Sequence, residues 1–235
     1  MKNQGHNIPQ RLPILARTSP RWMALIGTVT WLGSMLAMSG CLSKPALHEQ
    51  TFAFNEPASA LTNGAAASRV LGIKSVQIAP PFDGRPLVYR TGAFSYERDP
   101  YASFLSAPAD ALALPAAALL RRDGDFKEVV QRGDVNTAKP DTLVDINVSE
   151  LYGDIREPGK PRAVLALQVI FLDATNGLPG NIILLQNYSK EIPIKTTAPG
   201  DLMQGWNEAL AGIFAEAALD FRHQETAREA RDDSN

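Results

Sequence analysis

The part of the sequence that most constrains the fold is RAVLALQVIFLD, which runs from Arg162 to Asp173. Apolar side chains occupy both odd and even positions of this run, so both faces of an extended chain are apolar: Val164, Leu165, Leu167, Val169, Ile170 and Phe171. A strand that is buried on both faces has this kind of near-continuous apolar run. We therefore expect a central strand. Either the rest of the chain covers both of its faces, or one face meets a partner.

The segments around this run predict further strands of the same sheet. Residues 142–152 alternate between an apolar face (Val144, Ile146, Val148) and a polar face (Asp145, Asn147, Ser149), which is typical of a half-solvated antiparallel strand. Residues 70–79 are rich in aliphatic side chains and stop at Pro80. A second strand starts at Leu87 and continues through Phe94 and Tyr96, and residues 126–131 and 182–194 add two more.

Two segments have the periodicity of helices. In residues 199–221 large apolar side chains recur at spacings of three and four: Leu202, Trp206, Leu210, Ile213, Ala217 and Phe221. Such spacing places them on one face of a helix. Residues 103–122 are rich in Ala and Leu but contain Pro115, where we expect a kink. The predicted order is ββαββββα, and the predicted class is α+β: a mainly antiparallel sheet with two helices packed on one face.

The N-terminal region has the layout of a secretory signal. Four basic residues precede an uncharged, largely apolar run over 22–38, and the only cysteine of the chain, Cys41, follows Met38, Ser39 and Gly40. A basic segment, an apolar segment and a small-residue cleavage site define a signal peptide. A cysteine placed directly after small residues resembles the bacterial lipobox, in which that cysteine is acylated and becomes the first residue of the mature chain.

Two other interpretations of this region remain open. Cys41 can be a buried small hydrophobic residue, or the apolar run can be an uncleaved membrane anchor at the short end of the spanning range. Under the lipobox interpretation the chain divides into four parts. These are a signal peptide (1–40), a lipidated tether (41–69), an α+β domain (70–221) and a charged C-terminal tail or frayed helix end (222–235). The apolar patch 52–54 inside the tether can pair with an edge of the fold.

Composition limits the function classes. Removing residues 1–40, with their four basic side chains, leaves 195 residues that carry 19 basic and 25 acidic side chains, a formal charge of −6. A chain of this length buries a sufficient core without a disulfide, which a single thiol cannot form within the chain. No basic patch is present, so nucleic-acid binding is not expected. Membrane attachment is expected through the lipid on Cys41, because several acyl chains anchor a protein firmly.

Catalytic signatures are absent from the sequence. The three histidines, His6, His48 and His223, all lie outside the predicted core, and there is no Gly-x-Ser-x-Gly elbow, Walker loop or metal-ligand spacing. Asp123 and Asp125 flank Gly124 in a predicted loop, where acidic residues more commonly form solvated turns than acid–base pairs. We expect no enzyme activity, no cofactor and no metal.

Several motifs resemble one protein family. Residues 70–90 combine a strand that ends at Pro80, a short turn with Arg85, and the strand LVYR over 87–90. A tyrosine (Tyr96 or Tyr101), the run FLSAP over 104–108 and Gly124-x-Phe126-x-x-Val129 follow in order. This succession is similar to that of the ABC-type transport auxiliary lipoproteins, a family that includes the paraquat-inducible lipoprotein PqiC. The resemblance covers about residues 70–221.

The resemblance implies a non-enzymatic lipoprotein of the outer membrane that faces the periplasm. Family members are associated with Mce-type transport systems, so the implied partners are an Mce-domain protein, an ABC permease and its ATPase, and the implied cargo is a lipid or another hydrophobic molecule. Two alternatives are a periplasmic lipoprotein that carries lipid in its own cavity and a structural lipoprotein of envelope assembly. We expect a transport partner to bind at exposed positions near the Pro80–Arg90 turn, including Phe82, Arg85 and Tyr89.

Overall fold

The computed structural model describes residues 48–55, 69–124, 126–131, 133–176 and 180–232, all within the unit Leu47–Asn235. Cys41 and the predicted lipobox residues Met38, Ser39 and Gly40 lie outside the described residues, as does the rest of the predicted signal peptide. Within the described ranges no helix has the length and apolar character needed to cross a membrane.

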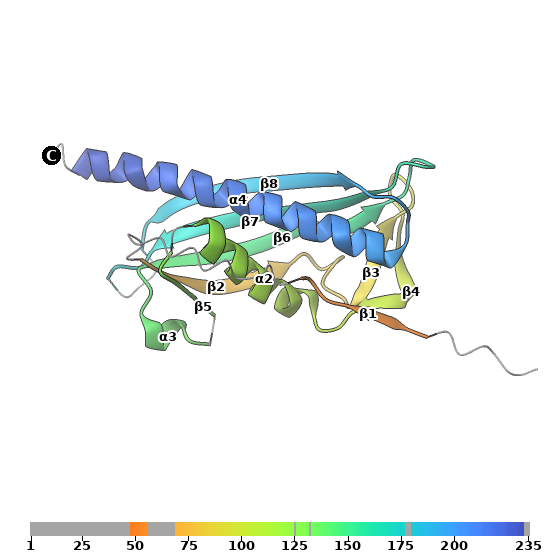
Figure 1. Cartoon of the computed structure of the whole chain (residues 1–235), viewed down its shortest axis with the longest axis horizontal. Helices are drawn as coiled ribbons and strands as arrows, with labels where there is room; N and C mark the ends of the chain where they lie inside the picture. Colours follow the sequence, from red (N-terminus) through yellow and green to blue (C-terminus); the bar gives the residue numbers. More distant parts are fainter. Residues whose placement is uncertain (1–47, 56–68, 125, 132, 177–179, 233–235) are drawn as a thin grey trace, which may run out of the picture. The chain divides into compact units, whose positions relative to one another are not determined.

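Eight strands and three helices make up the described part of the chain (Figure 1). The elements in chain order are β1 (Gln50–Phe52), β2 (Val70–Ile78), β3 (Pro86–Arg90), β4 (Tyr96–Phe104), α2 (Pro108–Asp123), β5 (Glu128–Val130), α3 (Val135–Ala138), β6 (Thr142–Asp154), β7 (Arg162–Asp173), β8 (Ile182–Pro193) and α4 (Pro199–Asp232). The α+β class predicted from the sequence is confirmed. The order differs from ββαββββα, because β1 and the short α3 are added and the predicted second strand turns back to form β3 and β4.

The sheet is mixed, whereas the sequence predicted a mainly antiparallel one. Strand β6 pairs in parallel with β2 over its first half and with β3 at its end, and β1–β4 and β2–β5 are also parallel. The pairs β3–β4, β6–β7 and β7–β8 are antiparallel. Parallel neighbours need a crossover connection, and the chain from β2 to β6 provides one through α2. Strand β7 lies between β6 and β8, so its predicted central position is confirmed.

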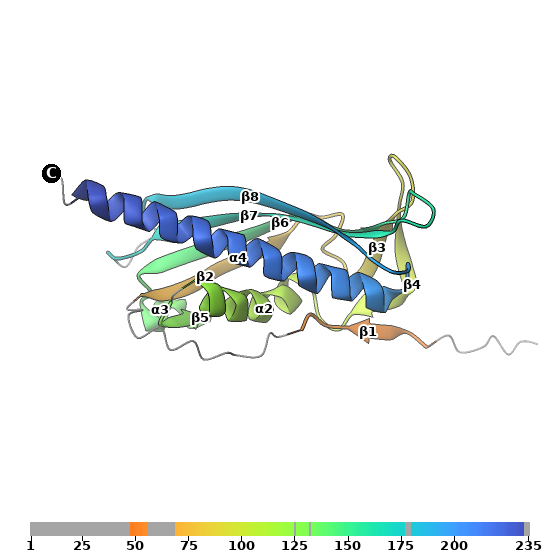
Figure 2. The same ribbon diagram turned by 45° about the horizontal axis from the view of Figure 1, so that its top comes forward.

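Helices α2 and α4 contact each other and cover the same face of the sheet (Figures 1 and 2). The apolar residues predicted for the face of the last helix are all buried: Leu202, Trp206, Leu210, Ile213, Ala217 and Phe221. Helix α4 continues to Asp232, through most of the predicted charged tail. Helix α2 begins at Pro108, five residues later than predicted, because residues 103 and 104 belong to β4, and it runs through Pro115 without a break.

The chain itself covers both ends of the second face of β7. At one end Val164 pairs across the strands with Tyr152 and is buried. At the other end Leu143, Leu172 and Ala174 form a small cluster with Val135 of α3. Between these ends Gln168 is only partly buried, and it lies in register with Asn147 and Asn187. The two-sided apolar pattern is therefore explained mainly by contacts within the chain.

Strand β1 joins a part of the predicted tether to the sheet. It pairs with β4 from Gln50 opposite Ala102 to Phe52 opposite Phe104, and the N–H of Leu105 donates to the carbonyl of Phe52 at 2.8 Å. Phe54 is buried against Phe104, with 5.7 Å between the ring centroids. The expectation that the apolar patch 52–54 pairs with an edge of the fold is confirmed at Phe52.

Candidate functional site

An aromatic cluster from the turn after β2, from β4 and from the end of β6 lies on the sheet face that α2 and α4 leave open. The ring of Phe82 lies 5.7 Å from that of Tyr152 and 5.9 Å from that of Tyr96, and the two tyrosine rings are 5.5 Å apart and nearly perpendicular. These are the stacked and edge-to-face geometries that aromatic pairs favour. We call Phe82, Tyr96 and Tyr152 the aromatic cluster.

Arg90 joins the aromatic cluster to the turn that follows β3. Its guanidinium carbon lies 5.7 Å from the ring centroid of Tyr96 and 5.9 Å from that of Tyr152, within range of a cation–π interaction. Its Nη2 donates to the carbonyl of Ala93 at 2.9 Å. Burial raises the pKa of the Tyr152 hydroxyl, although the hydrogen bond from Arg90 acts in the opposite direction. The tyrosine is therefore neutral at physiological pH and acts through packing.

The β3–β4 turn (residues 91–95) carries the most exposed large apolar side chain of the described chain. Phe94 is 98% exposed. The turn is closed by hydrogen bonds from the N–H groups of Thr91 and Gly92 to the carbonyl of Ser95, at 3.0 and 3.3 Å. With the bond from Arg90 to Ala93, these contacts fix the backbone that carries Phe94.

The β6–β7 turn (residues 155–161) lies beside the β3–β4 turn in both views (Figures 1 and 2), and the N–H of Ile155 donates to the carbonyl of Arg90 at 3.1 Å. Asp154, only 3% exposed, begins this turn. It accepts hydrogen bonds from Arg156 Nη2 at 2.6 Å and Nε at 3.0 Å, and from the Arg156 N–H at 3.1 Å. The hydrogen bond from the Arg156 side chain holds the pKa of this carboxyl below its usual value of 3.8, against the opposing effect of burial.

Replacing Asp154 with asparagine should lower the free energy of unfolding at pH 7 by about 1 kcal/mol, because the charge-assisted bond to Arg156 is lost. Folding lowers the pKa of Asp154, so its ionised form adds stability above its usual pKa of 3.8, and this stability is lost as the pH falls through the folded-state pKa. Urea denaturation at several pH values checks this. The difference between wild type and Asp154→Asn should persist at about pH 5 to 7 and shrink as the pH falls below 3.8.

Glu157→Gln is the matched control, because Glu157 lies in the same turn with an exposed carboxylate bonded to Lys160 at 3.2 Å. An exposed ion pair contributes little, so this variant should stay within about 0.5 kcal/mol of wild type. A gap between wild type and Asp154→Asn that is as large at pH 2 as at pH 7 would contradict the assigned role of the Asp154 carboxylate.

Two of the three residues predicted to contact a partner are not exposed. Phe82 and Tyr89 are 7% and 8% exposed, because Phe82 belongs to the aromatic cluster and Tyr89 faces α4. The Tyr89 hydroxyl donates to the carbonyl of Thr197 at 3.2 Å, and burial, with a smaller effect from the charge of Asp99, raises its pKa to about 12. Arg85 is exposed, and its Nε donates to the carbonyl of Phe104 at 2.9 Å. Of the three side chains predicted to contact a partner, only that of Arg85 is exposed.

The sequence pattern did not reveal the roles of Tyr152, Arg90 and Asp154. Tyr152 lies four residues after Val148, the last residue of the predicted apolar face of β6. Strict alternation would therefore place its side chain on the same face, toward the helices. A register shift between Val148 and Glu150 reverses the alternation. Arg90 and Tyr96 stood in the motifs that carried the family resemblance, and these motifs were the only sequence signal for the cluster.

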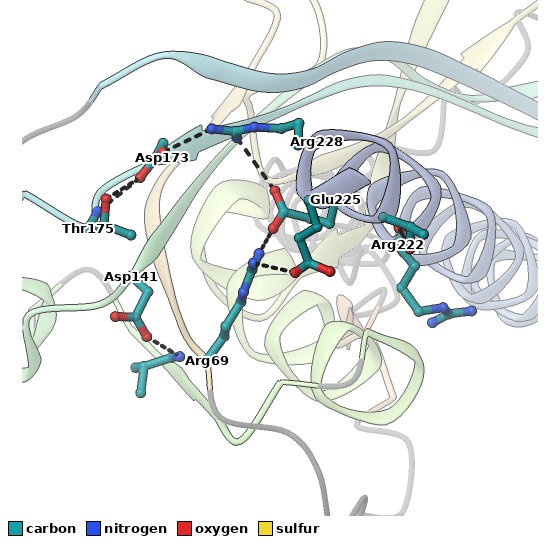
Figure 3. A network of polar contacts seen from close by, with 10 residues as sticks. Arg69, Asp141, Asp173, Thr175, Arg222, Glu225 and Arg228 are labelled. Atoms are coloured by element: carbon teal, nitrogen blue, oxygen red, sulfur yellow. Dashed lines mark hydrogen bonds and ion pairs between the residues drawn. The ribbon is translucent and has the colours of Figure 1, made fainter. Parts of the chain in front are cut away.

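A network of charged residues lies at the other end of the sheet, around a cavity of about 410 Å³ (Figure 3). Arg69 pairs with Glu225, and with Glu229 at 3.4 Å; Arg228 pairs with Asp173 at 3.1 Å. We call Arg69, Asp173, Glu225, Arg228 and Glu229 the charged network. It joins the last turns of α4 to β7 and to the residue before β2, which explains why the helix continues past the predicted end.

Hydrogen bonds hold Asp173 of the charged network in its ionised form. Asp173 accepts bonds from the N–H and the hydroxyl of Thr175 at 3.0 and 2.8 Å, and these bonds and Arg228 lower the pKa of its carboxyl. A carboxylate with a lowered pKa is a weak base and stays ionised at neutral pH. His48 and His223 are both exposed. Among the described residues no group of three or more His, Cys, Asp or Glu side chains is arranged to hold a metal ion.

Comparison with known proteins assigns this fold to a class of transport-associated lipoproteins. The family model described as the ABC-type transport auxiliary lipoprotein component matches residues 51–218. The chain therefore belongs to this family. The matched range starts inside β1 and ends in α4, so it includes all the other strands and the aromatic cluster. No match to the sequence is found among curated proteins.

Two solved structures share the fold. The crystal structure of protein XCC0632 from Xanthomonas campestris matches with a TM-score of 0.57 and 15% identity, over 77% of this chain and 98% of the other. A crystal structure described as an uncharacterized protein matches with a TM-score of 0.58 and 12% identity, over 74% and 98% of the two chains. At these identities the similarity supports the fold alone.

Proposed function

We propose that this chain is a non-enzymatic outer-membrane lipoprotein, an accessory component of an ABC/Mce-type system that moves lipids or other hydrophobic molecules across the cell envelope. The observation that carries the proposal is the match to the transport auxiliary lipoprotein family over residues 51–218, nearly the whole described domain. The partners are an Mce-domain protein, the ABC permease and the ATPase of the same system. The buried polar groups of the domain make structural hydrogen bonds. The domain therefore contributes to transport through its surface, by binding a partner.

The membrane attachment is a lipid on Cys41, which follows the lipobox residues Met38, Ser39 and Gly40. Residues 1–40 are the signal peptide that is removed when the lipid is added. The residue directly after the cysteine is Leu42. An aspartate at this position is associated with retention in the inner membrane, so a leucine there supports attachment to the outer membrane. The domain then faces the periplasm.

A transport partner binds at the β2–β3 turn (residues 79–85), through Arg85, the exposed residue of the three predicted from the sequence. Arg85 is exposed and bonded to the carbonyl of Phe104, and the next residue, Leu105, is 65% exposed. A cation beside an apolar side chain is a common composition for a protein contact, in which arginine is enriched. Phe82 and Tyr89 support this surface from below, because both are buried beside the turn and β3.

Affinity capture of the full-length lipoprotein from detergent-solubilised envelopes, followed by mass spectrometry, tests the proposal. Wild type should retain an Mce-domain protein with its permease, and its mature N-terminus should carry acyl chains on Cys41. Arg85→Glu should reduce the captured partner about tenfold, which corresponds to about 1.4 kcal/mol. Lys127→Glu is the matched charge reversal, since Lys127 is exposed and lies before β5, and it should capture as wild type does.

Different results would identify different errors. Equal capture by wild type and Arg85→Glu would remove the β2–β3 turn from the contact while leaving the transport role intact. Retention of lipid without any transport protein would favour a carrier. Retention of unrelated envelope proteins alone would favour a structural lipoprotein, and a mature chain without acyl groups would contradict the anchor on Cys41.

A further inference from the structure

The position of Phe94 gives no structural reason for a large apolar side chain. It is 98% exposed at the tip of the β3–β4 turn, and among the described residues its ring stacks on no other aromatic ring. An exposed phenylalanine gains nothing from folding, since hydrophobic stabilisation requires removal from water. The turn is nevertheless held firmly by the bond from Arg90 to Ala93 and by the two bonds to Ser95. The fold thus presents an apolar side chain on a fixed backbone.

The point where the N-terminal segment enters the domain lies at the same end. Strand β1, the β3–β4 turn and the β6–β7 turn are all found away from the C-terminal end of α4 (Figures 1 and 2). The position of β1 is fixed by its pairing with β4, by the buried ring of Phe54 and by a 2.8 Å bond from the Asn55 N–H to Asn207 Oδ1. Any anchor that precedes β1 is therefore attached at this end of the domain.

The lipidated chain that would precede β1 is short. Eight residues lie between Cys41 and Gln50, and the nine residue-to-residue steps between these two reach about 30 Å when extended. A lipid on Cys41 would thus keep this end of the domain within about 30 Å of the membrane surface. That distance is close enough for a projecting turn to touch the headgroups without any change in the fold.

We propose that Phe94 inserts into the headgroup region of the membrane that holds the lipid of Cys41, and that this second contact sets the orientation of the domain. The inference rests on the proposed lipidation of Cys41. Burial of one phenylalanine shifts an equilibrium about ten- to a hundredfold, which is too little to hold a free protein on a membrane. A short tether makes the contact intramolecular, so it forms without a second loss of translational freedom once the lipid is in place.

The contact of Phe94 with the membrane is hydrophobic and does not require anionic headgroups. In the adjacent β6–β7 turn both basic residues are paired within the chain, Arg156 with Asp154 at 2.6 Å and Lys160 with Glu157 at 3.2 Å. Paired surface charges leave little net attraction for anionic headgroups, and salt weakens what remains. Contact at Phe94 should therefore be insensitive both to salt and to the fraction of anionic lipid.

Tryptophan quenching by brominated lipids tests the insertion. The mature lipoprotein has a single tryptophan, Trp206, which is fully buried, so a second indole can be placed where needed. Phe94→Trp and the control Leu114→Trp, which alters a 54% exposed side chain of α2, are reconstituted into phosphatidylethanolamine–phosphatidylglycerol vesicles with or without brominated acyl chains. The indole introduced by Phe94→Trp should be quenched about twofold, since a headgroup-depth side chain comes within reach of the bromines. The control should emit equally in both vesicles.

Every outcome of this experiment bears on the inference. Equal emission of Phe94→Trp with and without brominated lipid, in a sample whose Cys41 is acylated by intact-mass measurement, overturns the membrane contact and leaves the proposed function standing. Protection of that indole only after a transport protein is added also overturns it, in favour of a protein partner. A sample in which Cys41 carries no acyl group overturns both proposals.

Discussion

Replacing Trp206 with alanine is expected to lower the free energy of unfolding by about 4 kcal/mol. Trp206 is fully buried, and its ring lies 5.7 Å from that of Phe104, which in turn stacks on Phe54. Its Nε1 donates to the carbonyl of Val164 at 3.1 Å. One side chain thus joins α4, β4, β7 and the segment after β1, so its truncation leaves a cavity among all of them and removes the bond to the Val164 carbonyl.

Urea denaturation followed by far-ultraviolet circular dichroism measures this loss. Trp206→Phe keeps most of the ring packing but removes the donor to Val164, and should cost about 1–2 kcal/mol. Leu219→Ala alters a half-exposed residue of the same helix, and should stay within about 0.5 kcal/mol of wild type. A Trp206→Ala variant as stable as Leu219→Ala would show that the stack of Phe54, Phe104 and Trp206 does not hold these elements together.

The same aromatic stack shows what the sequence could predict. The spacing of Trp206 in the pattern of α4 predicted its burial, and the apolar run of β7 predicted a central strand beneath it. Both are local periodicities, which indicate the face on which a side chain lies. They contain no information about the direction of a neighbouring strand. The parallel pairing of β2 with β6 therefore could not be predicted, because it depends on a crossover of about sixty residues.

The candidate site was harder to predict for a second physical reason. One register shift in β6, between Val148 and Glu150, moves Tyr152 to the face away from the helices, and a one-residue slip reverses every later side chain. Tyr152 then meets Phe82 and Tyr96, which come from segments about seventy and fifty-six residues earlier. Phe82 was predicted as an exposed contact because it lies in a turn, but this distant tyrosine buries it.

Helix α4 lies close against β7 at a glycine, and Gly205→Ala is expected to lower the free energy of unfolding by about 2 kcal/mol. A Cβ at Gly205 would lie 2.6 Å from Cβ of Ala163 and 2.7 Å from Cγ2 of Ile194. The Cβ of Ala163 is fixed to the backbone of β7 and cannot rotate away, so the helix itself has to shift. Alanine favours a helix over glycine by about 1 kcal/mol, but the overpacking outweighs this gain.

Gly212→Ala, two turns later in the same helix, is the matched test and should have the opposite sign. A Cβ at Gly212 would meet only Cε of Lys190, at an ordinary 3.6 Å, so the helix propensity of alanine acts alone and should raise stability by about 1 kcal/mol. The two variants carry the same chemical change in one helix. Their difference of about 3 kcal/mol in urea denaturation therefore reports the closeness of the helix to β7 at Gly205. Equal stabilisation by both substitutions would mean that α4 lies farther from the sheet at this position.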